Sequence, residues 1–164
     1  LVTDVFPALS LAWEPAEPGV MSRPPRVPGQ AILTNRFKLR LLTEGVVLTL
    51  GTLTGYLVTL NATANLTEAR TVTFMTLAIV QLLHTFNMRH GGIIKLDRTL
   101  FTNAYLWGAV ILVLGMQALA VYLPLLNRVL QTVPLNTGHL LTVTIAAMLP
   151  IIIIQVINRL VAWA

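Results

Sequence analysis

Residues Leu140–Val161 read LLTVTIAAMLPIIIIQVINRLV, an apolar run with a single formal charge, on Arg159. A helix of about 20 residues is long enough to cross a hydrocarbon core of roughly 30 Å. A segment inside a bilayer must also satisfy its own backbone hydrogen bonds, which a helix does. The Val, Ile and Thr residues of this run are typical of strands, but its length favours a membrane-spanning helix.

Three further apolar runs are also long enough to span a membrane as helices, and a shorter apolar run begins the chain. We predict spanning helices at Leu41–Leu60, Thr71–Met88 and Thr102–Leu123. Leu1–Trp13 is too short to span, and no basic segment or cleavage site of a signal peptide precedes it. We therefore expect residues 1–13 to be the end of a helix whose start is missing. The predicted fold class is an all-α membrane protein, a bundle of four full transmembrane helices plus a partial N-terminal one.

Composition agrees with a bilayer environment. Of the 164 residues, 55% are hydrophobic and only 10% are charged, and the mean hydropathy is +0.77. Soluble domains carry about 25% charged residues. The net charge of +5 is also compatible with nucleic-acid binding, but the basic residues lie between the apolar runs, which is typical of membrane topology. We expect the lipid bilayer as a partner and no nucleic acid. The absence of cysteine excludes disulfides and thiolate chemistry.

The connectors between the runs predict the orientation of the chain. If the proline- and arginine-rich loop at residues 14–40 is cytosolic, nine Lys and Arg residues lie on the cytosolic side and two on the other. This difference follows the positive-inside rule, so we expect the C-terminus to be cytosolic. The nine are Arg23, Arg26, Arg36, Lys38, Arg40, Arg89, Lys95, Arg98 and Arg159, and the two are Arg70 and Arg128.

Asp4 is the most informative charged residue of the apolar runs. A carboxylate at membrane depth costs about 2.5–3.5 kcal/mol on insertion scales, so it is rarely placed there without a partner. A hard cation such as calcium, which prefers carboxylate, hydroxyl and carbonyl oxygens, would be such a partner, and Thr3 adds a hydroxyl. We expect Pro7 to break the helix and to free carbonyl oxygens as further ligands. The alternative is that Asp4 lies near the bilayer edge and is hydrated.

The second full span carries a polar strip on an otherwise apolar helix. At about 100° per residue, Gln81, His84 and Thr85 share one face, which we expect to point into the bundle. Gln81 could offer its amide oxygen to an ion, or it could make an interhelical hydrogen bond, which is common in membrane bundles. In the first full span, Gly51 and Gly55 form a small-xxx-small pair that allows another helix to approach closely.

Two motifs near the start resemble those of P-type cation-transporting ATPases. Leu1–Pro15, LVTDVFPALSLAWEP, is similar to the sixth transmembrane helix of that family, and Met21–Arg26, MSRPPR, is similar to the loop that follows it. Arg70–Asn87 resembles the eighth helix of bacterial calcium-pump-like members. Tyr122–Pro124 and Val133–Leu135 are similar to the connection between the ninth and tenth helices. The resemblance covers essentially the whole chain, as helices six to ten.

The resemblance implies an ion-binding role for three residues. The family's Thr-Asp pair on the sixth helix corresponds to Thr3 and Asp4, and a polar or acidic residue of the eighth helix corresponds to Gln81. It implies a transported cation, calcium first among the candidates. It also implies that Gly51 and Gly55 pack the seventh helix against the fifth.

The resemblance also implies a coupling loop and a larger assembly. Arg23, Pro24, Pro25 and Arg26 correspond to the loop that contacts the cytosolic phosphorylation domain. The implied partner is the missing N-terminal pump portion, which comprises helices one to five and the cytosolic domains, in a bacterial plasma membrane. No phosphorylation or nucleotide-binding motif is present, so we expect this chain to bind no nucleotide and not to be catalytic alone.

Three functions are compatible with these patterns. The first is a membrane portion of an ATP-driven cation transporter, which contributes part of the ion site and the coupling loop. The second is a non-catalytic helical subunit or remnant with a structural or interaction role. The third is a small secondary carrier, which we disfavour because we expect only one buried acid, Asp4, and find no inverted repeat.

Overall fold

A computed structural model of the chain describes residues 2–15, 19–22, 24, 33–89, 94 and 98–161. Over these residues the chain is helical and contains no strand. Four helices, α2, α3, α4 and α6, are long and apolar enough to cross a membrane, and α1 is a shorter helix at the N-terminus. The predicted fold class is therefore confirmed. The elements are α1 (Val2–Ala12), η1 (Val20–Ser22), α2 (Asn35–Thr63), α3 (Leu66–Met88), η3 (Arg98–Phe101), α4 (Ala104–Tyr122), α5 (Pro124–Leu130) and α6 (Thr137–Leu160).

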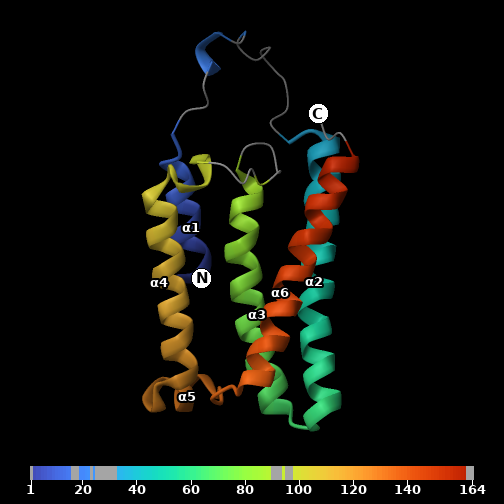
Figure 1. Cartoon of the computed structure of the whole chain (residues 1–164), viewed down its shortest axis with the longest axis vertical. Coiled ribbons are helices and arrows are strands. Elements are labelled where there is room, and N and C mark those ends of the chain that lie inside the picture. Colours follow the sequence, from blue (N-terminus) through green and yellow to red (C-terminus); the bar gives the residue numbers. More distant parts are fainter. Residues whose placement is uncertain are drawn as a thin grey trace.

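The long helices lie side by side, and their ends gather at two opposite ends of the bundle (Figure 1). At one end, drawn at the top, α1, α3 and α6 finish and α2 and α4 begin. We call this the basic end, because Arg36, Lys38, Arg40, Arg89 and Arg159 belong to the helix termini there. The other end holds the α2–α3 turn, α5 and the start of α6.

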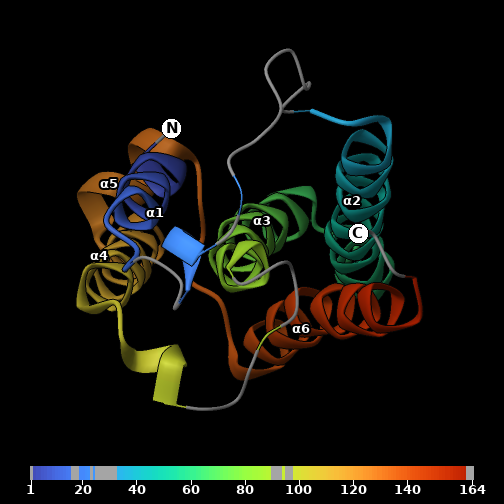
Figure 2. The same cartoon turned by 90° about the horizontal axis from the view of Figure 1, so that it is seen from above.

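Helix α3 is the centre of the bundle. On one side it packs with α2 and α6, which also pack against each other, and on its other side it contacts α1 and α4 (Figure 2). Ten of its residues are buried, compared with five in α2 and six in α4. Because lipid tails are as apolar as leucine, close packing rather than water exclusion holds such helices together.

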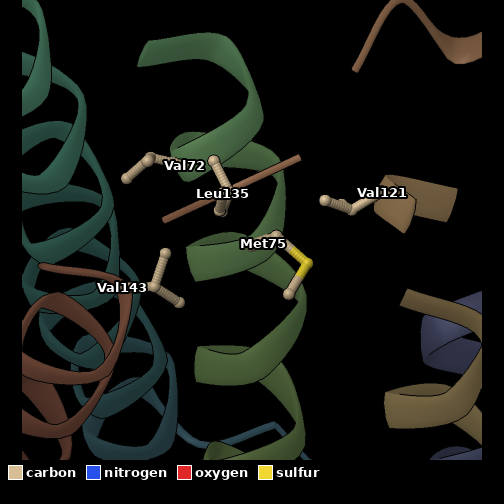
Figure 3. Close-up of a cluster of buried hydrophobic side chains, with 5 residues drawn as sticks. All are labelled: Val72, Met75, Val121, Leu135 and Val143. Carbon is tan, nitrogen blue, oxygen red and sulfur yellow. The ribbon is translucent and has the colours of Figure 1, made fainter. Parts of the chain in front are cut away.

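A cluster of buried apolar side chains joins the two sides of the bundle near the end opposite the basic end. Val72 and Met75 extend from α3 toward Val121 of α4 and Val143 of α6 (Figure 3). Leu135, in the connection before α6, lies over the same cluster and is 6% exposed. This cluster holds α3 between α4 and α6. It thereby determines which face of α3 is left to pack against α1.

Helix α2 is longer than the apolar run that predicts it. It begins at Asn35, where the side chain of Thr34 accepts a hydrogen bond from the Phe37 amide at 3.2 Å. Residues 35–40 are therefore helical, which corrects the expectation of a loop over residues 14–40. An apolar run marks only the part of a helix that lies in hydrocarbon, whereas a capped helix continues into polar surroundings.

Pro7 and Pro124 both lie in helices. Pro124 begins the short helix α5, where it is tolerated because the first helical position has no intrahelical N–H bond to lose. Pro7 was expected to break its helix, yet α1 continues from Val2 to Ala12. The ring still removes one backbone N–H, so the Thr3 carbonyl lacks its usual intrahelical donor even though the helix does not break.

The glycine pair of α2 lies at a close approach of α6. A Cβ atom on Gly51 would stand 2.0 Å from Cγ of Pro150 and 3.0 Å from the Ala146 carbonyl oxygen. A Cβ atom on Gly55 would stand 3.1 Å from the Ala146 Cβ and 3.4 Å from the Thr76 hydroxyl. The pair thus faces α6 and, at Gly55, also α3. The packing against a fifth helix that the resemblance implies stays a prediction.

Candidate cation-binding site

A cavity of about 190 Å³ lies between α1 and α3. It brings together the three residues singled out as ion ligands, Thr3 and Asp4 on α1 and Gln81 on α3. The remaining lining residues are Pro7, Ala8 and Leu11 of α1 and His84, Thr85 and Met88 of α3.

The α1 wall of this cavity carries the carboxylate. α1 begins about halfway along the bundle, where the N-terminus is marked, and runs to the basic end (Figure 1). Asp4 is in the first turn of α1, and its side chain is exposed rather than buried. The Thr3 hydroxyl lies 3.5 Å from Asp4 Oδ1. A hydroxyl, a carboxylate and the Thr3 carbonyl are thus close together on one helix turn.

The α3 wall contributes an amide. Gln81 is half-buried, and among the described residues its side chain makes no hydrogen bond, so the interhelical bond considered above is not formed there. The neighbouring Thr85 hydroxyl is not available in the same way, because it donates to the Gln81 carbonyl at 3.0 Å. The polar strip does face inward, toward α1. Gln81 is its member best placed to serve a ligand in the cavity.

The donor set has a defined chemical preference. Hydroxyl, carboxylate and amide oxygens suit hard cations such as calcium and magnesium rather than soft metals. Calcium takes six to eight oxygen ligands, more than these side chains supply. Among the described residues no group of three or more His, Asp or Glu side chains is close enough to hold a metal ion. The cavity can therefore supply one side of a hard-cation site.

A second polar cluster, which the sequence analysis missed, joins α2, α3 and α6. Glu44 of α2 is only 2% exposed. Its Oε1 accepts hydrogen bonds from Arg40 Nε and from Asn158 Nδ2, both at 2.9 Å. Its Oε2 faces His84 Nε2 at 3.5 Å and makes no hydrogen bond to the described residues. The i, i+4 spacing of Arg40 and Glu44 was the sequence signal that could have indicated this pair.

The predicted coupling loop is described only in part. Arg23, Pro25 and Arg26 lie outside the described residues, and Pro24 is exposed. The preceding turn η1 places Met21 in solvent, 94% exposed, at the basic end of the bundle. The Ser22 amide and hydroxyl both donate to the Gly19 carbonyl, at 3.1 and 2.7 Å, which closes this turn.

Comparison with known proteins gives the family that the motifs resemble, over residues 1–160. A family model described as "Cation transporting ATPase, C-terminus" matches residues 1–160. The calcium-transporting ATPase of Bacillus subtilis is 30% identical over 139 residues, which cover 84% of this chain and 16% of that protein. The "Probable cation-transporting ATPase F" of Mycobacterium bovis is 31% identical over 144 residues, 84% of this chain and 15% of that protein.

A third relative extends the match along the chain. "Calcium-transporting ATPase 1" of Bacillus cereus is 26% identical over 174 residues, 96% of this chain and 20% of that protein. The chain thus spans between 15% and 20% of the length of these three relatives. With four apolar spanning helices and a family match over nearly all its residues, this integral membrane chain belongs to the P-type cation-transporting ATPases, as their C-terminal membrane region.

Proposed function

We propose that this region provides part of the cation-binding site of an ATP-driven pump, with Thr3, Asp4 and Gln81 as ligands. The observation that carries the proposal is the cavity in which these three residues, from α1 and α3, face one space. Calcium is the cation we propose, because two of the relatives compared are named as calcium transporters and the donors are all oxygens. The remaining ligands would come from helices that precede α1 in the pump.

The position of Asp4 supports this role over hydration at the bilayer edge. α1 begins near the middle of the bundle, so a carboxylate in its first turn lies deep relative to the ends of the spanning helices. A charge at that depth is stabilised by water in a cavity or by a counter-ion. A cation bound between α1 and α3 would be both counter-ion and cargo.

We also propose that the loop after α1 couples this site to the cytosolic domains, through Arg23, Pro24, Pro25 and Arg26. Its support is the turn η1 directly before this loop, which has no buried residue and in which Met21 is exposed. The basic end would then be cytosolic, together with the C-terminus. The partner would be the N-terminal pump portion, and the membrane a bacterial plasma membrane.

The ligand assignment is tested by Asp4→Asn in a pump assembled from this chain and the preceding part of a cation-transporting ATPase, co-expressed or fused. Asparagine keeps the shape and removes the charge, and a contact that depends on a charge is worth about 1.5–3 kcal/mol. We expect the half-saturating calcium concentration for ATP hydrolysis to rise about tenfold or more, since 1.4 kcal/mol is tenfold. Gln81→Leu is expected to have a smaller effect in the same direction.

The matched control is Glu68→Gln, a carboxylate-to-amide change at a residue that pairs with His139 outside the cavity. It is expected to leave the calcium dependence unchanged. If Asp4→Asn instead leaves the calcium dependence unchanged, Asp4 is not a ligand. The structural role of this chain in the membrane would then be the better explanation.

The orientation is tested by single cysteines, which the cysteine-free chain allows without background. Met21→Cys lies in the turn η1, and Ala62→Cys is exposed near the end of α2 at the opposite end of the bundle. With a membrane-impermeant maleimide, we expect Met21→Cys to react only from the cytosolic side and Ala62→Cys only from outside. The reverse pattern would overturn the orientation.

A further inference from the structure

At the basic end, three polar side chains connect α1, α3 and α4. Glu14 follows the end of α1, Arg89 follows the last residue of α3, and Asn103 caps the start of α4. Arg89 donates from Nε and Nη2 to Glu14 Oε1, the first at 3.0 Å. Asn103 donates from Nδ2 to Glu14 Oε2 at 2.7 Å and to the Ser10 carbonyl at 2.9 Å. Both carboxylate oxygens of Glu14 are therefore held.

The guanidinium of Arg89 is held on its other edge by the connection before α4. It donates to the Leu100 carbonyl and to the Thr102 hydroxyl, each at 3.2 Å. The indole of Trp107 donates to the same Leu100 carbonyl at 3.1 Å. Arg89 is 5% exposed despite its charge. The Glu14 side chain is 21% exposed, so the pair is buried mainly on the Arg89 side. Removing one partner of a buried, hydrogen-bonded ion pair disrupts its surroundings far more than removing one partner of a solvent-exposed pair.

This cluster lies directly beyond the cavity between α1 and α3. Leu11 lines the cavity one turn before Glu14, and Met88 lines it immediately before Arg89. The chief neighbours of α1 among the described elements are α3 and α4, the two helices whose ends the cluster joins to it. The separation of the two cavity walls is therefore set at this end by the bonds of Glu14.

We propose that Glu14, Arg89 and Asn103 are positioning residues that hold α1 at the distance from α3 at which Thr3, Asp4 and Gln81 reach the same cation. The inference rests on the proposed cation site, but none of the three residues lines the cavity. They act through the placement of α1. Changes to residues that hydrogen-bond directly to metal ligands reduce metal affinity roughly 10- to 100-fold in other proteins. Because Glu14, Arg89 and Asn103 act on the helix ends and not on the ligands themselves, we expect an effect at the lower end of that range.

The first test measures the separation of the helices in the chain itself. Ala8→Cys and Thr85→Cys place thiols on facing cavity walls, and Thr54→Cys and Ile145→Cys place a control pair across the groove between α2 and α6. We expect Glu14→Gln and Arg89→Gln each to slow oxidative cross-linking of the first pair severalfold and to leave the control pair unchanged. An unchanged rate for the first pair would overturn the inference.

The second test measures calcium affinity in the assembled pump. We expect Glu14→Gln and Arg89→Gln each to raise the half-saturating calcium concentration roughly tenfold, with little change in turnover at saturating calcium. Because both remove the same contact, the double variant should be no worse than the stronger single one. A fully additive double variant, or a loss of turnover alone, would count against positioning. Arg89→Lys is the milder variant if Arg89→Gln does not accumulate.

The two proposals fail in distinguishable ways. If Asp4→Asn leaves the calcium dependence unchanged, the cation site is wrong, while the cross-linking rate still reports whether Glu14 and Arg89 place α1. If Asp4→Asn weakens calcium dependence but the Glu14 and Arg89 variants do not, the site stands and the positioning role is wrong. Arg128→Gln, an exposed arginine at the opposite end, is the control for loss of positive charge.

Discussion

Replacing Glu44 with leucine is expected to destabilise the chain by about 3–5 kcal/mol, the range found when one partner of a buried ion pair is removed. The change leaves the guanidinium of Arg40, which is 8% exposed, without the carboxylate that accepts from it, and Asn158 loses the same acceptor. Because the cluster joins α2 to α6 and faces His84 of α3, the loss should loosen all three helices. Unfolding in mixed micelles with rising SDS, followed by circular dichroism, measures the change.

A double variant separates the charge from the packing. Replacing Arg40 with methionine in the Glu44→Leu background also removes the buried positive charge that was paired with Glu44, and apolar replacement of a whole buried pair is often close to neutral. We therefore expect Arg40→Met with Glu44→Leu to recover much of the lost stability. If the double variant is less stable than Glu44→Leu alone, the ion pair does not explain the effect. Glu44→Gln, which keeps an acceptor for Asn158, should lie between the wild type and Glu44→Leu.

Replacing Gly51 with alanine is the second change for which a large effect is expected, about 3 kcal/mol of destabilisation. Overpacking usually costs about 1–3 kcal/mol, and this site lies at the upper end for a geometric reason. The added methyl would stand 2.0 Å from the ring of Pro150 and 3.0 Å from the backbone oxygen of Ala146. Neither a proline ring nor a helix backbone can rotate away, so α2 and α6 must separate.

Two other glycines of α2, Gly45 and Gly55, provide matched controls. Gly55→Ala requires only a shift of a few tenths of an ångström at Ala146, so about 1 kcal/mol is expected. Gly45→Ala meets nothing within 4 Å and should be neutral or stabilising by up to about 1 kcal/mol, because alanine is the better helix former. The same SDS titration ranks the three variants. An effect of Gly51→Ala no larger than that of Gly45→Ala would contradict the close approach of α2 and α6.

Part of the candidate site could be predicted before the structure was known. Thr3, Asp4 and Gln81 were singled out by a charge in an apolar run, by a polar strip and by a family resemblance, and the cavity brings them together. The exposure of Asp4 and the continuity of α1 through Pro7 could not be predicted, because they depend on which helices flank α1. The Glu44 cluster was missed for a similar reason, since Asn158, its partner on α6, is 114 positions away.

The sequence by itself determined the spanning helices and the fold class, because a bilayer imposes its requirements on each segment separately, through length, apolar content and internal hydrogen bonding. Only the tertiary structure decided which helices are neighbours. Small residues such as Gly51 and Gly55 mark a face that another helix can approach, but they do not reveal which helix is the partner. The approach of Gly51 to Pro150 and the bond of Arg89 to Glu14, 75 positions apart, are contacts of this kind. The arrangement of the helices is determined by close packing and by polar contacts between residues far apart in the sequence, and not by the periodicity of each segment.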